Sequence, residues 1–260
     1  MNGAGIIHGV SSRLSRGRLL LVALGLAGAV AAGIARGAEV VIAWDPELAP
    51  PGDREAYERQ LREIVRDAQA GATADLGMEL RRPLTVKVHS RAGFEREFGK
   101  DAVHLDAARF VGEVIHVNGG TRLDDRFAGL VVHEMAHAVL DDRGTAASLP
   151  RWLDEGLAER LSWKRRGMDG LAPNQVAELK QAAERHVLTP LPATGELSRF
   201  GYLQAYAAVL FLETKFGRDK VLAVVRATLG GAPFDRAMQR ELGWSTADLE
   251  RAFTAWASRR

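Results

Sequence analysis

The sequence predicts an α+β fold, in which a small mixed sheet is followed by a largely helical C-terminal subdomain. Short runs typical of strands occur in the first half of the 260-residue chain. From Asp124 onward, the apolar residues recur at helical spacing. The composition, 47% hydrophobic and 26% charged, is typical of a globular protein with a substantial core.

Three strands are expected in the first half. Residues 40–44 are an apolar run that closes on Asp-Pro, and residues 84–89 alternate between apolar and polar side chains. Residues 113–117 end at Asn-Gly-Gly, which is a turn signal. Helical spacing predicts helices over 53–70 and 91–98.

The second half is expected to consist of helices. The first, from 124 to about 141, has an apolar stripe and ends at Asp-Asp-Arg-Gly, and Pro150 introduces the next. Further helices are expected at 174–186, 202–216, 219–229, 233–242 and 246–258, with a Pro-interrupted loop at 188–198. Residues 39–143 would therefore hold the sheet and the first of these helices, and residues 144–260 the helical subdomain.

Residues 1–38 are predicted to be a signal peptide or an uncleaved signal anchor. Arginines 13, 16 and 18 precede an apolar run of 17 residues from Leu19 to Ala35. That length is near the lower limit for crossing a bilayer, and small residues would permit cleavage after Ala35. We expect export from a bacterial cytoplasm to the periplasm or cell envelope, with secretion also possible. Membrane contact is expected only through an uncleaved N-terminal segment.

The charge distribution argues against a nucleic-acid partner. The formal net charge is +2, and it becomes −2 without residues 1–38, which hold four arginines and no acid. The remaining chain has no basic stripe of the kind that binds phosphates. The absence of cysteine excludes disulfides, thiolate nucleophiles and Cys-ligated metal. The oligomeric state cannot be read from these features.

The segment His133-Glu134-Met135-Ala136-His137 is an HExxH motif on the predicted 124–141 helix. Residues four apart lie on one helix face, so both imidazoles can reach one Zn²⁺ ion. Glu134 would lie beside the ion and act as the base that takes a proton from water. A catalytic zinc site usually has a third protein ligand and one position open to solvent.

The segment Pro150-Arg-Trp-Leu-Asp-Glu-Gly-Leu-Ala-Glu159 resembles the second motif of the gluzincin metallopeptidases, and in detail the peptidase MA-like family. The resemblance covers about residues 84–258 and implies a zincin-like fold. It implies that Glu155 is the third zinc ligand and that Glu159 accepts a hydrogen bond from a zinc-binding histidine. Asp154, one step round the helix, is expected at the surface.

The resemblance also implies a tyrosine near the start of the 202–216 helix that donates a hydrogen bond to the reaction intermediate. Tyr202 matches that place best, and Tyr206 follows one turn later. In zincins, the strand before the HExxH helix borders the cleft and pairs with extended substrate. His116 on the predicted 113–117 strand could therefore line a subsite, although an ordinary strand residue is the simpler interpretation.

These features predict a zinc-dependent peptidase that hydrolyses peptide bonds of peptide or protein substrates through an activated water. Two alternatives stay open: a catalytically degenerate zinc-binding protein used in envelope assembly, and a zinc hydrolase of a non-peptide amide or ester. Retention of Glu134 between the histidines argues against the first, because a structural site needs no base. Cleavage specificity and the choice between endopeptidase and exopeptidase action are not readable from the sequence.

Overall fold

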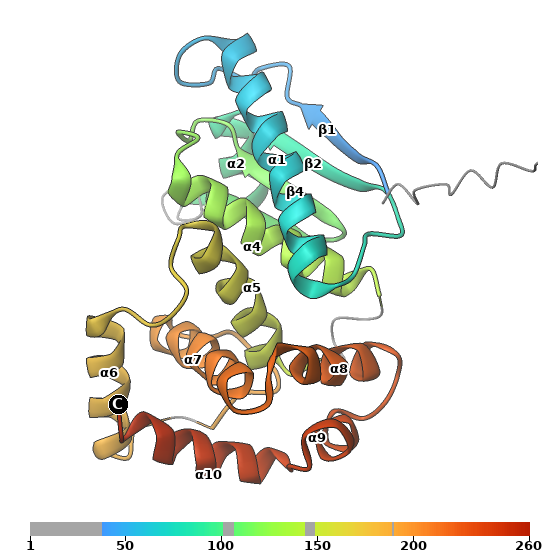
Figure 1. The fold of residues 1–260 in the computed structure, drawn as a ribbon. Coiled ribbons are helices and arrows are strands. Elements are labelled where there is room, and N and C mark those ends of the chain that lie inside the picture. Colours follow the sequence, from blue (N-terminus) through green and yellow to red (C-terminus); the bar gives the residue numbers. More distant parts are fainter. Residues whose placement is uncertain (1–37, 101–106, 144–148, 189) are drawn as a thin grey trace, which may run out of the picture. The chain divides into compact units, whose positions relative to one another are not determined.

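The computed structural model describes residues 38–100, 107–143, 149–188 and 190–260, so the predicted signal segment lies outside it apart from Ala38. The predicted α+β fold is confirmed (Figure 1). The first half contains, in chain order, β1 Val40–Trp44, α1 Arg54–Leu76, β2 Leu84–His89, α2 Arg91–Phe98, β3 Ala108–Val111, β4 Val114–Asn118 and α4 Asp125–Asp141. The second half contains α5 Arg151–Arg165, α6 Pro173–Glu184, α7 Arg199–Phe216, α8 Arg218–Leu229, α9 Phe234–Leu242 and α10 Thr246–Ala257. Within the described ranges, no helix is both long and apolar enough to cross a membrane.

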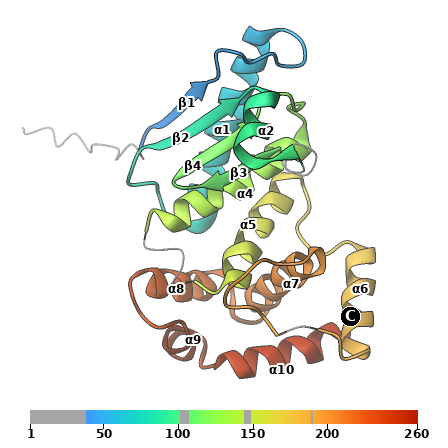
Figure 2. The same cartoon turned by 180° about the vertical axis from the view of Figure 1, so that it is seen from behind.

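The sheet has the strand order β1-β2-β4-β3. β1, β2 and β4 run parallel, and β3 is an antiparallel edge strand paired with β4. Figures 1 and 2 show α1 and α4 on one face of the sheet and α2 on the other. The face toward α1 and α4 carries apolar side chains, which the two helices cover. Val86, Val88, Ile115 and Val117 are all fully buried there.

Most predicted elements are confirmed to within a few residues, and two differences are informative. Helix α1 continues past the predicted end at residue 70 to Leu76, where Gly77 ends it in the left-handed conformation (φ 61°). Strand β3 was not predicted, because its four residues are too few for a readable alternation. It returns into β4 through Gly112 and Glu113, both with positive φ, which is typical of a tight hairpin turn.

The presence of β3 corrects the prediction that the 113–117 strand borders the cleft. That strand is β4, and it is paired on both sides, with β2 and with β3. The edge strand that packs against α4 is β3. His116 of β4 is buried, and its Nδ1 lies 2.9 Å from His89 Nε2 beneath Phe98 of α2. A subsite role for His116 is therefore wrong, and the simpler interpretation as a strand residue holds.

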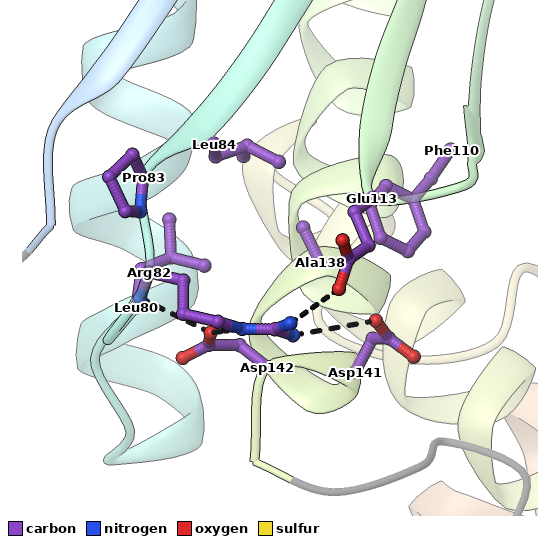
Figure 3. Close-up of a pocket in the computed structure, with 9 residues that line it drawn as sticks. All are labelled: Leu80, Arg82, Pro83, Leu84, Phe110, Glu113, Ala138, Asp141 and Asp142. Carbon is purple, nitrogen blue, oxygen red and sulfur yellow. Dashed lines mark hydrogen bonds and ion pairs between the residues drawn. The ribbon is translucent and has the colours of Figure 1, made fainter.

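Arg82 holds the β3–β4 hairpin to the end of α4 (Figure 3). Its guanidinium forms ion pairs with Glu113 in the hairpin turn and with Asp142, whose carboxylate lies 2.8 Å from Nε. These groups line a small pocket of about 60 Å³ together with Phe110 and Ala138. Burial tends to raise the pKa of Asp142, but hydrogen bonds from the side chain and backbone of Arg82 lower it below its ordinary value. The end of α4 is thus fixed relative to β3.

Helices α5 and α7 approach closely at Gly156. A Cβ atom at this position would lie 2.5 Å from the Ala205 carbonyl oxygen and 2.7 Å from Val209 Cγ2. Such contacts are too short for any side chain, so only glycine fits here. The close approach fixes α5 between α4 and α7.

The substitution Gly156→Ala is predicted to lower the free energy of unfolding by about 1–3 kcal/mol, because the added methyl group forces α5 and α7 apart. Gly71→Ala in α1 is the matched control, since a Cβ there meets no atom within 4 Å. The control should stabilise by about 0.5–1 kcal/mol through helix propensity. Urea titration followed by circular dichroism measures both, and equal stability of the two variants would contradict this account of Gly156.

Candidate metal centre

Helix α4 positions the HExxH residues. Its N-cap is Asp124, whose side chain accepts a hydrogen bond from the Phe127 N–H, and its apolar stripe packs into the core. His133 and His137 lie one turn apart on the side toward α5, with ring centroids separated by 4.8 Å. Glu134 lies beside them and is buried. The helix thus brings both imidazoles to one place, as its spacing predicts.

Helix α5 brings Glu155 to the same place. Its N-cap is Pro150, which makes no side-chain cap, and its first N–H groups are satisfied by a loop instead. The N–H of Arg151 donates to the Ala193 carbonyl (2.8 Å) and that of Trp152 donates to the Pro192 carbonyl (3.1 Å). The loop before α7 therefore fixes the first turn of α5, and with it the carboxylate of Glu155.

Three atoms converge between the two helices: Nε2 of His133, Nε2 of His137 and Oε2 of Glu155. The two nitrogens are 3.1 Å apart, and the oxygen lies 3.2 Å from the first and 3.4 Å from the second. Ligands placed tetrahedrally around zinc at its usual bond lengths are about 3.3 Å apart. The triangle has the size that such an ion requires, and these residues form the group with metal-binding potential in the described part of the chain.

The outer sides of both imidazoles are engaged by carboxylates. His137 Nδ1 lies 3.0 Å from Asp154 Oδ1, and His133 Nδ1 lies 3.4 Å from Glu159 Oε1. Carboxylates accept hydrogen bonds, so in the neutral ring each Nδ1 is the nitrogen placed to carry the proton, which leaves the lone pair of Nε2 for an ion. Glu155 Oε2 is buried and makes no hydrogen bond within the described residues. Three lone pairs facing one another fit a bound cation, and they are unfavourable without one.

The electrostatics of the cluster favour a cation as well. Burial lowers the pKa of His137, but Asp154 and Glu155 outweigh it and raise that pKa well above its ordinary value. The pKa of His133 is raised in the same way, chiefly by Glu155 acting against burial. Burial alone would raise the pKa of Glu155, yet the two histidines hold it below its ordinary range. A positive charge is therefore stabilised where the three atoms meet, and protons and metal ions would compete for that position.

Asp154 corrects a prediction, since it was expected at the surface but is only 6% exposed. The reason is that every residue of α5 from Trp152 to Ala158 is buried. The side chain of Asp154, next to Glu155, therefore faces α4 and not solvent. Asp154 contacts His137 through Oδ1 and Arg151 through Oδ2. The sequence signal was the adjacent pair Asp154-Glu155, which could have suggested one carboxylate for the ion and one for a histidine.

Glu159 lies as the resemblance implied, on the next turn of α5 and against His133. Its second oxygen, Oε2, accepts a hydrogen bond of 2.8 Å from Trp163 Nε1. The indole therefore fixes the orientation of the carboxylate. The geometry shows which residues contact one another. That His133, His137 and Glu155 are ligands, and that Asp154 and Glu159 support the histidines, remain predictions.

Glu134 connects the helix that carries the two histidines to the edge of the sheet. Its Oε2 accepts a hydrogen bond of 2.7 Å from the backbone N–H of Phe110 in β3. Burial raises the pKa of Glu134 above its ordinary value, although the neighbouring histidines act in the opposite direction. A carboxylate with a raised pKa is better able to receive and return a proton near neutral pH.

The two candidate tyrosines of α7 lie in different surroundings. Tyr206 is 1% exposed, stacks on Trp163 and donates a hydrogen bond of 3.2 Å to the Gly170 carbonyl. Tyr202 is partly exposed, and burial raises its pKa to about 12, with the charge of Glu155 adding to the rise. Tyr202 thus remains a protonated donor next to the cluster, whereas the hydroxyl of Tyr206 is used in the core.

Comparison with known proteins adds one finding. The family model described as Peptidase MA superfamily matches residues 113–259, which include β4, the helices α4 and α5 that carry His133, His137 and Glu155, and the remaining helices to α10. A search of the curated proteins finds no match.

The substitution Asp154→Ala is predicted to weaken zinc affinity by about 10–100-fold, because His137 loses the acceptor that orients its ring and increases its basicity. Asp219→Ala, in the exposed first turn of α8, is the matched control and should leave the affinity unchanged. Competition with a chromogenic chelator measures the dissociation constants. Wild-type affinity in the Asp154 variant would contradict the assigned contact.

Proposed function

This chain belongs to the Peptidase MA superfamily, and we propose that it is a zinc-dependent peptidase of the gluzincin type. The observation that carries the proposal is the convergence of His133, His137 and Glu155 on one point, with the buried Glu134 next to His133 in the chain and close enough to interact with the charges of all three. Two histidines and one carboxylate from successive helices are a donor set typical of catalytic zinc. Peptides and proteins are the substrates that membership of this superfamily favours.

Different residues would carry out the separate steps of peptide-bond hydrolysis. A zinc ion held by the three ligands would act as a Lewis acid that polarises the scissile carbonyl and lowers the pKa of water. Glu134 takes a proton from the attacking water as the C–O bond forms, and then delivers it to the amide nitrogen as the C–N bond breaks. Tyr202 donates its hydroxyl proton in a hydrogen bond to the developing oxyanion. Its hydroxyl is protonated at neutral pH, as that of any tyrosine with a pKa of 10 or above is.

Strand β3 is the proposed surface for aligning the substrate. It is an edge strand of the sheet and packs against α4 beside Glu134. An extended peptide could add to it as a further antiparallel strand, with backbone hydrogen bonds giving affinity. Val111 at its end is 47% exposed, so the strand offers apolar side-chain surface as well.

We also propose that the peptidase acts in the bacterial cell envelope. The support comes from the sequence of residues 1–38, with arginines ahead of an apolar run and small residues at its end. Contact with the membrane would be limited to that segment if it stays uncleaved.

Glu134→Gln is predicted to abolish hydrolysis of unfolded casein while retaining bound zinc, with kcat reduced by a factor of about 10²–10⁴ because the amide cannot accept a proton. The control Glu178→Gln, on the exposed face of α6, should have wild-type activity. Chelation should inactivate the wild type and zinc should restore it. Equal rates in wild type and Glu134→Gln would refute the proposed base, and bound zinc without cleavage of casein or a peptide library would favour a non-peptidase role.

Tyr202→Phe is predicted to lower kcat by a factor of about 10²–10³ with little change in KM, because it removes one donor to the oxyanion. Tyr206→Phe is the matched control on the same helix. It should leave kcat unchanged and lower stability by about 0.5–1.5 kcal/mol through loss of the hydrogen bond to Gly170. Steady-state kinetics and urea titration of both variants decide the assignment, and the opposite pattern would transfer the role to Tyr206.

A further inference from the structure

Arg151 occupies a position at which a cation is normally unfavourable. It is the first residue of α5, where the positive end of the helix dipole favours acidic side chains. Residues that contradict a local preference are found mainly where function requires them. The charge of Arg151 therefore calls for an explanation beyond helix formation.

The guanidinium of Arg151 contacts both carboxylates that α5 directs at the histidines. Nη2 forms an ion pair with Glu155 Oε1, and Nη1 lies 3.4 Å from Asp154 Oδ2. Both acids follow at helical spacing, three and four residues after the arginine. In each acid, the arginine takes one oxygen and the opposite oxygen faces a histidine. One side chain thus fixes the orientation of two carboxylates.

The pair differs from an ordinary helix-surface ion pair. Arg54 and Glu58 of α1 have the same positions, first residue and four later, but both are accessible to solvent. The Glu155 side chain, in contrast, is 2% exposed, so its charge is not screened by water. Four carboxylates lie at or near the two histidines, namely Glu134, Asp154, Glu155 and Glu159. Arg151 offsets part of this negative charge.

We propose that Arg151 is a positioning residue that makes Glu155 a ligand through one oxygen only. By holding Oε1, it leaves Oε2 alone to face the two imidazoles. A carboxylate free to turn would offer both oxygens to the ion and fill a position that water or the substrate carbonyl needs. The inference rests on the proposed zinc-peptidase function, and it assigns a role to a residue outside the three ligands.

The test compares wild type, Arg151→Met, Arg151→Lys and the matched control Arg54→Met, each loaded with cobalt in place of zinc. Cobalt reports the number of its ligands through visible absorption, which is intense for four-coordinate and weak for five-coordinate sites. We expect wild type and Arg54→Met to give the same intense spectrum. Arg151→Met should bind cobalt with a weakened spectrum, and Arg151→Lys should restore it, because one ammonium suffices to hold Oε1.

Activity provides a second readout. Arg151→Met should lower kcat by about 10–100-fold, whereas Arg54→Met should not change it. If Arg151→Met fails to fold, Arg151→Ala serves in its place with the same expectations. An unchanged cobalt spectrum in the folded Arg151 variant would overturn the inference and leave the proposed function intact. Failure of the wild type to take up cobalt or zinc would overturn both.

Discussion

The structure depends on one constraint: three lone-pair atoms from two successive helices must meet at a point that is unfavourable without a cation. Nε2 of His133 and His137 and Oε2 of Glu155 lie within 3.1–3.4 Å of one another in a buried position. Packing determines this arrangement, because α5 lies between α4 and α7 and Gly156 permits the close approach to α7. The core thus supplies the rigidity, and a bound ion would supply the missing interaction.

A further set of contacts surrounds the two histidines and Glu134. Asp154 and Glu159 contact the Nδ1 atoms of the histidines, Trp163 donates a hydrogen bond to Glu159, and the Phe110 backbone donates one to Glu134. These groups come from α4, α5 and β3, so the site is sensitive to how the sheet edge and the two helices pack. The Arg82 contacts in Figure 3 keep the β3–β4 hairpin beside α4 and thereby help to hold in place the strand whose backbone contacts Glu134. Positioning of this kind is what separates a catalytic centre from a pair of nearby histidines.

Much of this was predictable from the sequence, and the failures have physical causes. The HExxH spacing predicted that His133 and His137 share one helix face, because helical periodicity fixes that face. The choice of Glu155 as their partner came only from the resemblance of its segment to the gluzincin motif. Strand β3 was missed because four residues carry too little pattern. Asp154 was misplaced because a single helix read in isolation does not reveal that α5 is buried on all sides over seven residues, from Trp152 to Ala158. Tertiary burial of this kind depends on α4 and α7, which lie elsewhere in the sequence.

The central claim is that Glu155 completes a metal centre begun by the two histidines. Metal analysis of the purified mature protein after dialysis, wild type beside Glu155→Ala, tests it most directly. The account predicts about one zinc ion per wild-type chain and little or none in the variant, because two imidazoles alone bind zinc weakly. Equal zinc content in both proteins, or none in the wild type, would contradict it.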